Sequence, residues 1–229
     1  MSVRKSLEHE PDPAGYEPMA HAVTRRLRDA IIGGEIRPGA PVRQETIARE
    51  MGTSRIPVRE ALRQLEAEGL ITIRPHFGAR VAVQDFEECM EVYKIREQLE
   101  PLAIAESMSL MTHAQIDEAA TLARDIEAKT ADAAAWLDLD RRFHLACYVA
   151  APLPRLLRMI ENYWNTTQQY RRIVLATFTE HDFHVFQGEH QLIVEALRER
   201  DEDAGKNLVR IHLERGRRRL AANRQLFQS

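Results

Sequence analysis

The chain has 229 residues, of which 44% are hydrophobic and 29% charged, and its formal net charge is -3. This composition excludes a mainly disordered, collagen-like or membrane-spanning chain. Its apolar runs are far shorter than the roughly 20 residues needed to cross a bilayer. Residues 1–18 hold no apolar stretch typical of a secretory signal and are expected to form a disordered tail. The two cysteines, Cys89 and Cys147, lie far apart and exclude a disulfide framework, so we expect a cytoplasmic protein. From its length we expect one or two domains, and from its short apolar runs no membrane partner.

Charge is distributed unevenly along the chain. Residues 21–83 carry eleven arginines against seven acidic residues, a net charge of +4, so the rest of the chain is at -7. Such an asymmetry indicates a cationic module that faces a polyanion, joined to an acidic module with a different task. Chance is the alternative explanation.

Three short helices are expected in the cationic segment. The first is predicted by apolar residues at every fourth position: Val23, Leu27 and Ile31. A second short helix stops at Gly52, and Thr53-Ser54 offers N-caps to a third helix that ends at Gly69. The turn of about three residues between the last two helices is the spacing of a helix-turn-helix.

A two-stranded wing is predicted directly after the third helix. Residues 70–73 and 79–83 are strand-like, and the turn at 75–78 separates them. In a helix-turn-helix the second helix presents its N-terminal residues to base edges. Arg55 and Arg59 are four apart on one helical face, so both can reach the same groove. A merely solvated basic face is the alternative.

The run PGAPVRQETIAREMGTSRIPVREALRQLEAEGLITIRPHFGARVAV, with IIGGEIRPG before it, resembles the winged helix-turn-helix of the GntR family of bacterial transcription regulators. The resemblance implies a DNA-binding domain over residues 19–84, with double-stranded DNA as its partner. It implies that Arg55 and Arg59 contact bases and phosphates, and that His76 and Gly78 form the wing tip. Further candidates for DNA contact are Arg43, Arg49, Thr53 and Ser54. Gln44-Glu45-Thr46 stand where some relatives carry another DNA-contacting arginine.

Beyond Val83 the sequence predicts only helices. Patterns of a cap residue followed three positions later by Glu or Gln begin at Asp85 and Thr112, and Asp132 and Asp203 mark further boundaries. Helices are expected near residues 85–110, 113–129, 133–150, 154–178, 184–200 and 203–225. Pro101 is expected to kink or split the first. The predicted fold is therefore mainly α: a winged helix-turn-helix followed by an antiparallel helical bundle over residues 85–225.

A candidate metal set is spread over three of these helices: Asp140, His144, His190 and His212. The first two are four positions apart, so their side chains project side by side. Three imidazoles and one carboxylate suit zinc, nickel, iron or manganese and leave one or two coordination positions open. Separately satisfied histidines are the alternative, and His181 and His184 are further histidines close by in sequence.

Three segments, YKIREQLEPLAIAESM, LDLDRRFHLACYVAA and EHQLIVEALRERDEDAGKNLVRIHL, resemble the FCD ligand-binding domain of FadR-type GntR regulators over roughly residues 86–222. The resemblance implies that the candidate set binds a divalent metal, zinc before nickel, manganese or iron, at the floor of an effector pocket. It also argues against a long-chain acyl-CoA effector. Arg96 matches an arginine that can pair with an effector carboxylate, and an intrahelical salt bridge with Glu100 is its alternative role.

Together these features predict a DNA-binding transcription regulator and not an enzyme. We expect a homodimeric repressor on a palindromic operator, with a small organic acid sensed through the metal. Two alternatives stay open: a metal-dependent enzyme with a His3Asp site, and a regulator whose metal is purely structural.

Overall fold

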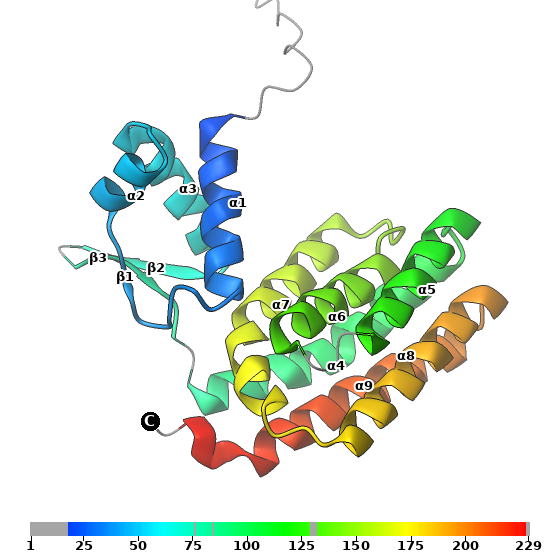
Figure 1. Cartoon of the computed structure of the whole chain (residues 1–229). Coiled ribbons are helices and arrows are strands. Elements are labelled where there is room, and N and C mark those ends of the chain that lie inside the picture. The colour runs from blue at the N-terminus through cyan, green and yellow to red at the C-terminus, as the bar shows by residue number, and fades with distance from the viewer. Residues whose placement is uncertain (1–17, 76, 84, 129–131, 228–229) are drawn as a thin grey trace, which may run out of the picture.

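A computed structural model describes residues 18–75, 77–83, 85–128 and 132–227 (Figure 1). The tail expected at residues 1–18, apart from Pro18, lies outside the described residues, as does the wing-tip candidate His76. The N-terminal elements, blue to cyan in Figure 1, lie beside a larger group of helices, green to red. Each group has its own buried hydrophobic core.

Three helices and a small sheet form the N-terminal group: α1 (Met19–Ile32), β1 (Pro41–Val42), α2 (Gln44–Glu50), α3 (Arg55–Ala67), β2 (Ile71–Arg74) and β3 (Gly78–Val81). The sheet is antiparallel with the order β1-β3-β2. The two predicted strands of the wing are present as β2 and β3, and the sequence analysis missed the third strand, β1. Two residues are too short to show strand periodicity, and Pro41, which has no N–H, fits only the edge position that β1 occupies.

The expected helix-turn-helix forms as α2 and α3. Val23 and Leu27 of α1 are buried against Val58, Leu62 and Leu65 of α3 in the N-terminal core. The apolar residues recur at helical spacing in α1 and in α3, which explains why the sequence pattern located these two helices. Ser54 is the N-cap residue of α3, as predicted, but its side chain makes no capping hydrogen bond.

Six helices and a short 3-10 turn follow: α4 (Phe86–Met108), α5 (His113–Glu127), α6 (Ala133–Cys147), α7 (Pro154–Leu175), α8 (Glu180–Glu199), α9 (Glu202–Ala222) and η1 (Arg224–Phe227). No strand occurs among residues 85–128 and 132–227. The predicted fold class, a winged helix-turn-helix followed by an all-α bundle, is confirmed. The helices that the structure describes also include none with the length and apolar character of a membrane span.

Capping residues set most helix starts in the bundle. The capping boxes predicted at Asp85 and Thr112 are both present. Helix α8 begins four residues before its predicted start, because Thr179 and Asp182 form a third capping box. Asp replaces the usual Glu or Gln in this box, so its sequence signal was weak. The last long helix is capped by Asp201, two residues before the predicted boundary.

Helix α4 runs unbroken through Pro101, so it is not split in two. A proline inside a helix removes one i→i-4 hydrogen bond and crowds the preceding turn. Here α4 lies along α9. In the turn that precedes Pro101, Arg96 forms an ion pair with Glu100 inside the bundle. Packing therefore holds the helix through a residue that would end an isolated one.

Candidate functional site

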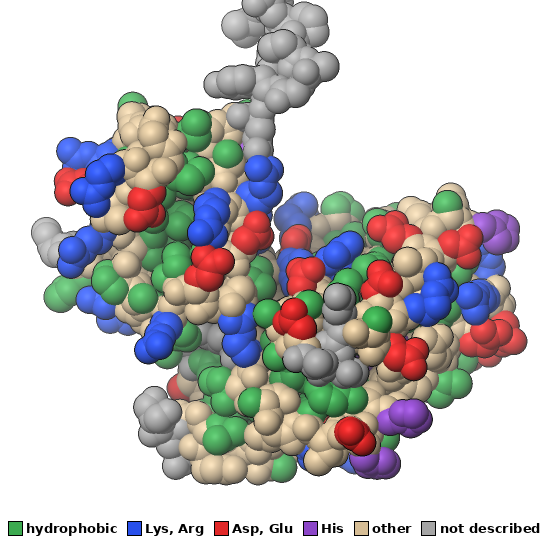
Figure 2. All heavy atoms as spheres, viewed as in Figure 1, with side chains coloured by type: hydrophobic (Ala, Val, Ile, Leu, Met, Phe, Trp, Pro, Cys, Tyr) green, Lys and Arg blue, Asp and Glu red, His purple; other side chains and the backbone are tan. Residues whose placement is uncertain are grey.

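The N-terminal end of α3 forms an exposed basic surface, and Figure 2 shows Lys and Arg side chains distributed over this part of the molecule. Arg55 and Arg59 both reach solvent there. The Nη1 atom of Arg55 lies 3.0 Å from Oε1 of Glu45 on α2, and these side chains are 68% and 78% exposed. An ion pair this exposed contributes only about 0–1 kcal/mol to stability. A phosphate group can therefore replace the Glu45 carboxylate at little cost.

The other predicted DNA-contacting residues surround this surface. Arg43, Arg49 and Ser54 are exposed, and Thr53 is half-buried. Gly78 begins β3 with φ +77°, and no atom of the described residues beyond its two chain neighbours lies within 4 Å of where a Cβ would be. A left-handed backbone, not crowding, therefore requires glycine at this position. Contacts of these residues with DNA stay predictions.

Two exposed apolar residues lie in the same region and were missed from the sequence. Ile56 in the first turn of α3 is 60% exposed, and Phe77 beside the wing turn is 77% exposed. The sequence did offer a sign that Ile56 is exposed, because this residue does not share the helical face of the buried residues Val58 and Leu62. Apolar side chains on such surfaces can contact thymine methyl groups.

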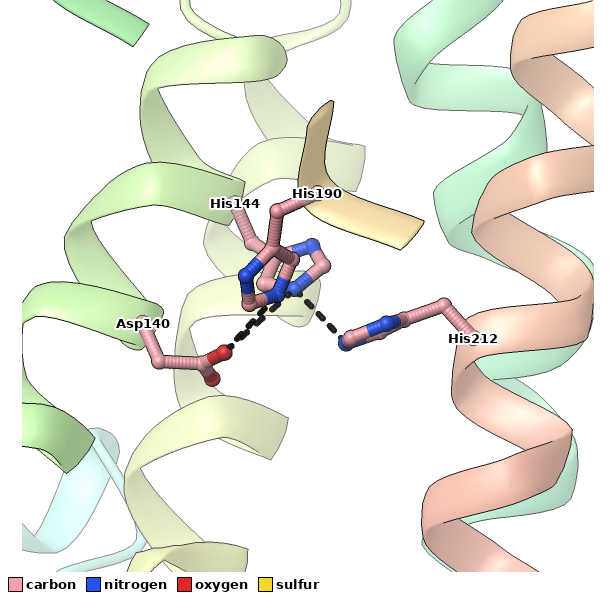
Figure 3. Close-up of side chains that lie close together, drawn as sticks. All are labelled: Asp140, His144, His190 and His212. Carbon is pink, nitrogen blue, oxygen red and sulfur yellow. Dashed lines mark hydrogen bonds and ion pairs between the residues drawn. The ribbon is translucent and has the colours of Figure 1, made fainter. Parts of the chain in front are cut away.

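The second candidate site lies inside the bundle, where all four predicted metal ligands meet (Figure 3). Helix α6 supplies Asp140 and His144, α8 supplies His190, and α9 supplies His212. Their ligand atoms all lie within 4.8 Å of one another, and none of the side chains is more than slightly exposed. The one-turn spacing on α6 and the packing of α8 against α9 create the cluster.

Hydrogen bonds around the cluster fix which ring nitrogens carry protons. The Nδ1 atom of His212 lies 3.0 Å from Oε2 of Glu189, and a carboxylate only accepts, so His212 donates from Nδ1. Tyr148 gives its hydroxyl proton to Glu100 at 2.8 Å and therefore accepts from Nδ1 of His144 at 3.3 Å. The Nε2 atoms of both histidines then carry lone pairs, and they face each other at 3.1 Å.

Burial sets the charges of the remaining groups. Burial and the nearby His212 lower the pKa of His144 well below its usual range, and burial also lowers the pKa of His190. Burial alone would raise the pKa of Asp140, but Arg171 and His190 hold it well below its usual range. At neutral pH His144 and His190 are therefore neutral and Asp140 is ionised, the protonation states that bind a cation.

Several polar atoms of the cluster lack a hydrogen-bond partner among the described residues. They are Oδ1 of Asp140 and both ring nitrogens of His190, whose Nε2 lies 3.1 Å from that oxygen without hydrogen-bond geometry. An unsatisfied buried polar atom costs about 1–3 kcal/mol. A divalent cation would satisfy Oδ1 of Asp140, one ring nitrogen of His190 and the two facing lone pairs, so the residues fit a metal.

Outer residues orient the ligands, and sequence reasoning did not assign them this role. The Nη2 atom of Arg171 on α7 donates to Oδ2 of Asp140, which leaves Oδ1 facing the histidines. Glu189 holds His212 and is held in turn by Nε of Arg215 at 2.6 Å. Such partners fix the orientation of metal ligands in proteins. They come from separate helices, so no sequence spacing could reveal them.

A cavity of about 40 Å³ adjoins the cluster at His212. Five aromatic side chains and three arginines share its lining: Tyr93, Trp136, Trp164, Phe178, Phe186, Arg96, Arg171 and Arg219. Its volume is well below the roughly 300–1,000 Å³ of typical ligand pockets, so a bound molecule requires the lining side chains to separate.

Arg96 is fully buried at this cavity, and its predicted intrahelical salt bridge is present. Its Nε lies 2.5 Å from Oε1 of Glu100, and its guanidinium carbon lies 3.9 Å from the centre of the Trp164 ring. Its Nη2 has no hydrogen-bond partner among the described residues. The ion pair therefore leaves one donor free, and the predicted role in effector binding stays a prediction.

The lowered histidine pKa values predict a pH-dependent stability of the metal-free protein. The unfolded chain takes up protons at His144 and His190 near pH 6.5, whereas the folded chain resists protonation. The free energy of unfolding should therefore fall as pH drops below about 6.5, by up to about 1.4 kcal/mol per pH unit for each histidine. Urea titrations in chelator at pH 7.5, 6.5 and 5.5 measure this loss. The exposed His184→Gln variant should show the same slope, and a pH-independent free energy would contradict the assignment.

A winged helix-turn-helix joined to a helical bundle that buries a His3Asp cluster is the architecture of a DNA-binding regulator. The model of the bacterial regulatory proteins of the gntR family matches residues 19–81, and the FCD domain model matches residues 91–215. The chain belongs to the GntR family of transcription regulators that carry an FCD domain. The expectation of a regulator rather than an enzyme is confirmed by this family.

Individual relatives agree with this family. The repressor GlaR of Escherichia coli is 29% identical over 202 residues, which cover 82% of this chain and 90% of GlaR. A probable D-xylose utilization operon repressor of Paenarthrobacter nicotinovorans is 42% identical over 85 residues, 35% of this chain and 38% of that protein. The structure of E. coli McbR/YncC superposes with a TM-score of 0.80 at 22% identity and covers 90% of this chain and 99% of its own. It supports the fold alone.

Proposed function

We propose that this protein is a repressor whose FCD domain binds a divalent metal and a small organic acid, and that the acid changes its affinity for operator DNA. DNA binding follows from the family. We infer a cytoplasmic homodimer, because twofold symmetry would place two α3 helices on a palindromic operator. The two facing Nε2 lone pairs of His144 and His212, beside the partnerless oxygen of Asp140, carry the metal proposal.

Zinc is the favoured ion, with nickel, manganese or iron as alternatives. Three imidazoles and one carboxylate suit these ions and leave coordination positions open. When bound, the metal would supply a positive charge that attracts a carboxylate. The chain itself keeps Asp140 ionised through Arg171 and keeps the His212 ring oriented through Glu189.

The cavity lining favours an acid with an apolar body. Each arginine of the lining already has an acidic partner: Glu100 for Arg96, Asp140 for Arg171 and Asp182 for Arg219. The fully buried Nη2 of Arg96 nevertheless lacks a partner and can donate to one carboxylate. Aromatic and aliphatic side chains make up most of the remaining wall, so they would pack against hydrocarbon.

Elemental analysis combined with thermal unfolding tests this function. We expect about one metal per chain, and an increase in melting temperature with an apolar carboxylate only in the metal-loaded protein. A purely structural metal would raise the melting temperature without any acid-dependent change in operator affinity. Absence of metal after reloading with zinc, nickel or manganese would contradict the metal site.

Loss of the Arg59 side chain should weaken operator binding. We expect Arg59→Ala to cost about 1–3 kcal/mol of binding free energy, the value of a bidentate contact with a base. Fluorescence anisotropy with an operator duplex selected from random sequences by the wild-type protein measures the change. Arg142→Ala, an exposed arginine on α6, is the control and should bind normally. Unchanged affinity of Arg59→Ala would show that this residue is only a solvated cation.

A further inference from the structure

Helix α7 lies between the candidate effector site and the N-terminal elements, and its two faces have different partners. At 3.6 residues per turn, Trp164 and Arg171 share one face, whereas Asn162 and Thr166 share the opposite face. Trp164 and Arg171 line the cavity, and Arg171 also holds Asp140. The opposite face approaches the helix-turn-helix.

Arg172, next to Arg171, binds the end of α1. Its guanidinium donates to the backbone oxygens of Ile32 and Gly33. The last carbonyls of a helix lack partners within it and carry the negative end of the helix dipole, so a cation is favoured there. Gly34 has φ +78°, and a Cβ at this position would lie 1.8 Å from Nη1 of Arg172. This glycine, which follows the C-cap of α1, therefore leaves room for the guanidinium of Arg172.

A second contact joins α7 to the end of the recognition helix α3. The Nδ2 atom of Asn162 donates to the backbone oxygen of Ala67 at 3.1 Å. Gly69, with φ +72°, follows α3, and a Cβ there would lie 2.7 Å from Cγ2 of Thr166. Both core helices of the N-terminal group thus end against the same helix of the bundle.

We propose that Arg172 and Asn162 are positioning residues that couple the cavity to the orientation of α3. A ligand that separates the lining side chains moves α7, and the two contacts carry that movement to the ends of α1 and α3. The source of the movement rests on the proposed effector site. The contacts exist independently of it, and coupling between two sites acts equally in both directions. DNA binding must therefore alter α7.

Hydrogen exchange of the full-length chain, with and without the selected operator duplex, tests this coupling. In the wild-type protein, DNA should slow amide exchange within residues 160–171 by about fivefold or more, the lower end of typical allosteric couplings. The Asn162→Leu/Arg172→Met variant should bind DNA and lose this change. Arg172→Lys, which can still donate to the carbonyls, should retain part of it. Arg158→Met removes an exposed arginine of the same helix and should behave as the wild type.

Two results would overturn the coupling: no change in α7 when wild-type protein binds DNA, or an equal change in the double variant. Addition of zinc to protein from which a chelator has removed metal provides the reverse test. Amide hydrogen exchange within residues 29–36 should then change in the wild type and not in the double variant. If elemental analysis finds no bound metal after reloading with zinc, nickel or manganese, the metal proposal fails. The experiment with DNA still decides whether α7 couples the two parts.

Discussion

His144→Ala should remove the metal and leave the fold and DNA binding of the metal-free protein intact. The variant deletes one of two Nε2 atoms that face each other at 3.1 Å, so the remaining residues offer three ligands instead of four. We expect metal affinity to fall by more than about 100-fold, the upper end of the loss caused by removing an outer partner of a ligand. Titration with a competing chromophoric chelator measures this loss.

The stability of the metal-loaded protein should follow the same pattern. At free metal 1,000 times above its Kd, the wild type gains about 4 kcal/mol of unfolding free energy, and His144→Ala should gain less than about 1.4 kcal/mol at the same concentration. His184→Ala provides a matched control, because this histidine is exposed on α8 and lies outside the cluster. Equal metal content in His144→Ala and the wild type would contradict the site.

Arg96→Met should destabilise the protein strongly. Its partner Glu100 is fully buried and would keep a charge without a counter-ion. Removal of one member of a buried pair costs about 3–5 kcal/mol, although a fully apolar replacement of both members is often neutral. The double variant Arg96→Met/Glu100→Leu should therefore recover most of the unfolding free energy in urea titrations, less the hydrogen bond from Tyr148.

An exposed pair with the same i,i+4 spacing serves as the control. Arg142 lies 3.6 Å from Asp138, and their side chains are 55% and 59% exposed. Arg142→Met should change the unfolding free energy by less than about 1 kcal/mol. If Arg96→Met and Arg142→Met have the same small effect, Glu100 is not held as a buried anion by Arg96.

The sequence was sufficient where regular spacing determines the structure. Helical periodicity located α1 and α3, and the one-turn separation of Asp140 and His144 placed two ligands side by side. Strand β1 was missed because pairing with β3, not local pattern, defines a two-residue edge strand. The capping box at Thr179 was missed because Asp replaces the usual partner.

The chemistry of the cluster required the three-dimensional structure. Glu189 and Tyr148 determine which nitrogens of His212 and His144 carry protons. Tyr148 is one turn after His144, but the direction of its hydroxyl proton is set by Glu100 of another helix, and Glu189 is far from His212 in sequence. The buried donor of Arg96 likewise depends on packing against Trp164 of another helix. Sequence could identify the four candidate ligands but could not establish their protonation states or the arrangement of the cavity.

Operator affinity of the full-length protein tests the central proposal most directly. It should be measured in chelator and in saturating zinc, nickel or manganese, each across a panel of apolar carboxylates. At least one acid should weaken operator binding by about fivefold or more in the metal-loaded protein and have no effect in chelator. Operator affinity that no acid changes with any metal would contradict an acid-sensing repressor and leave a DNA-binding protein with a structural metal.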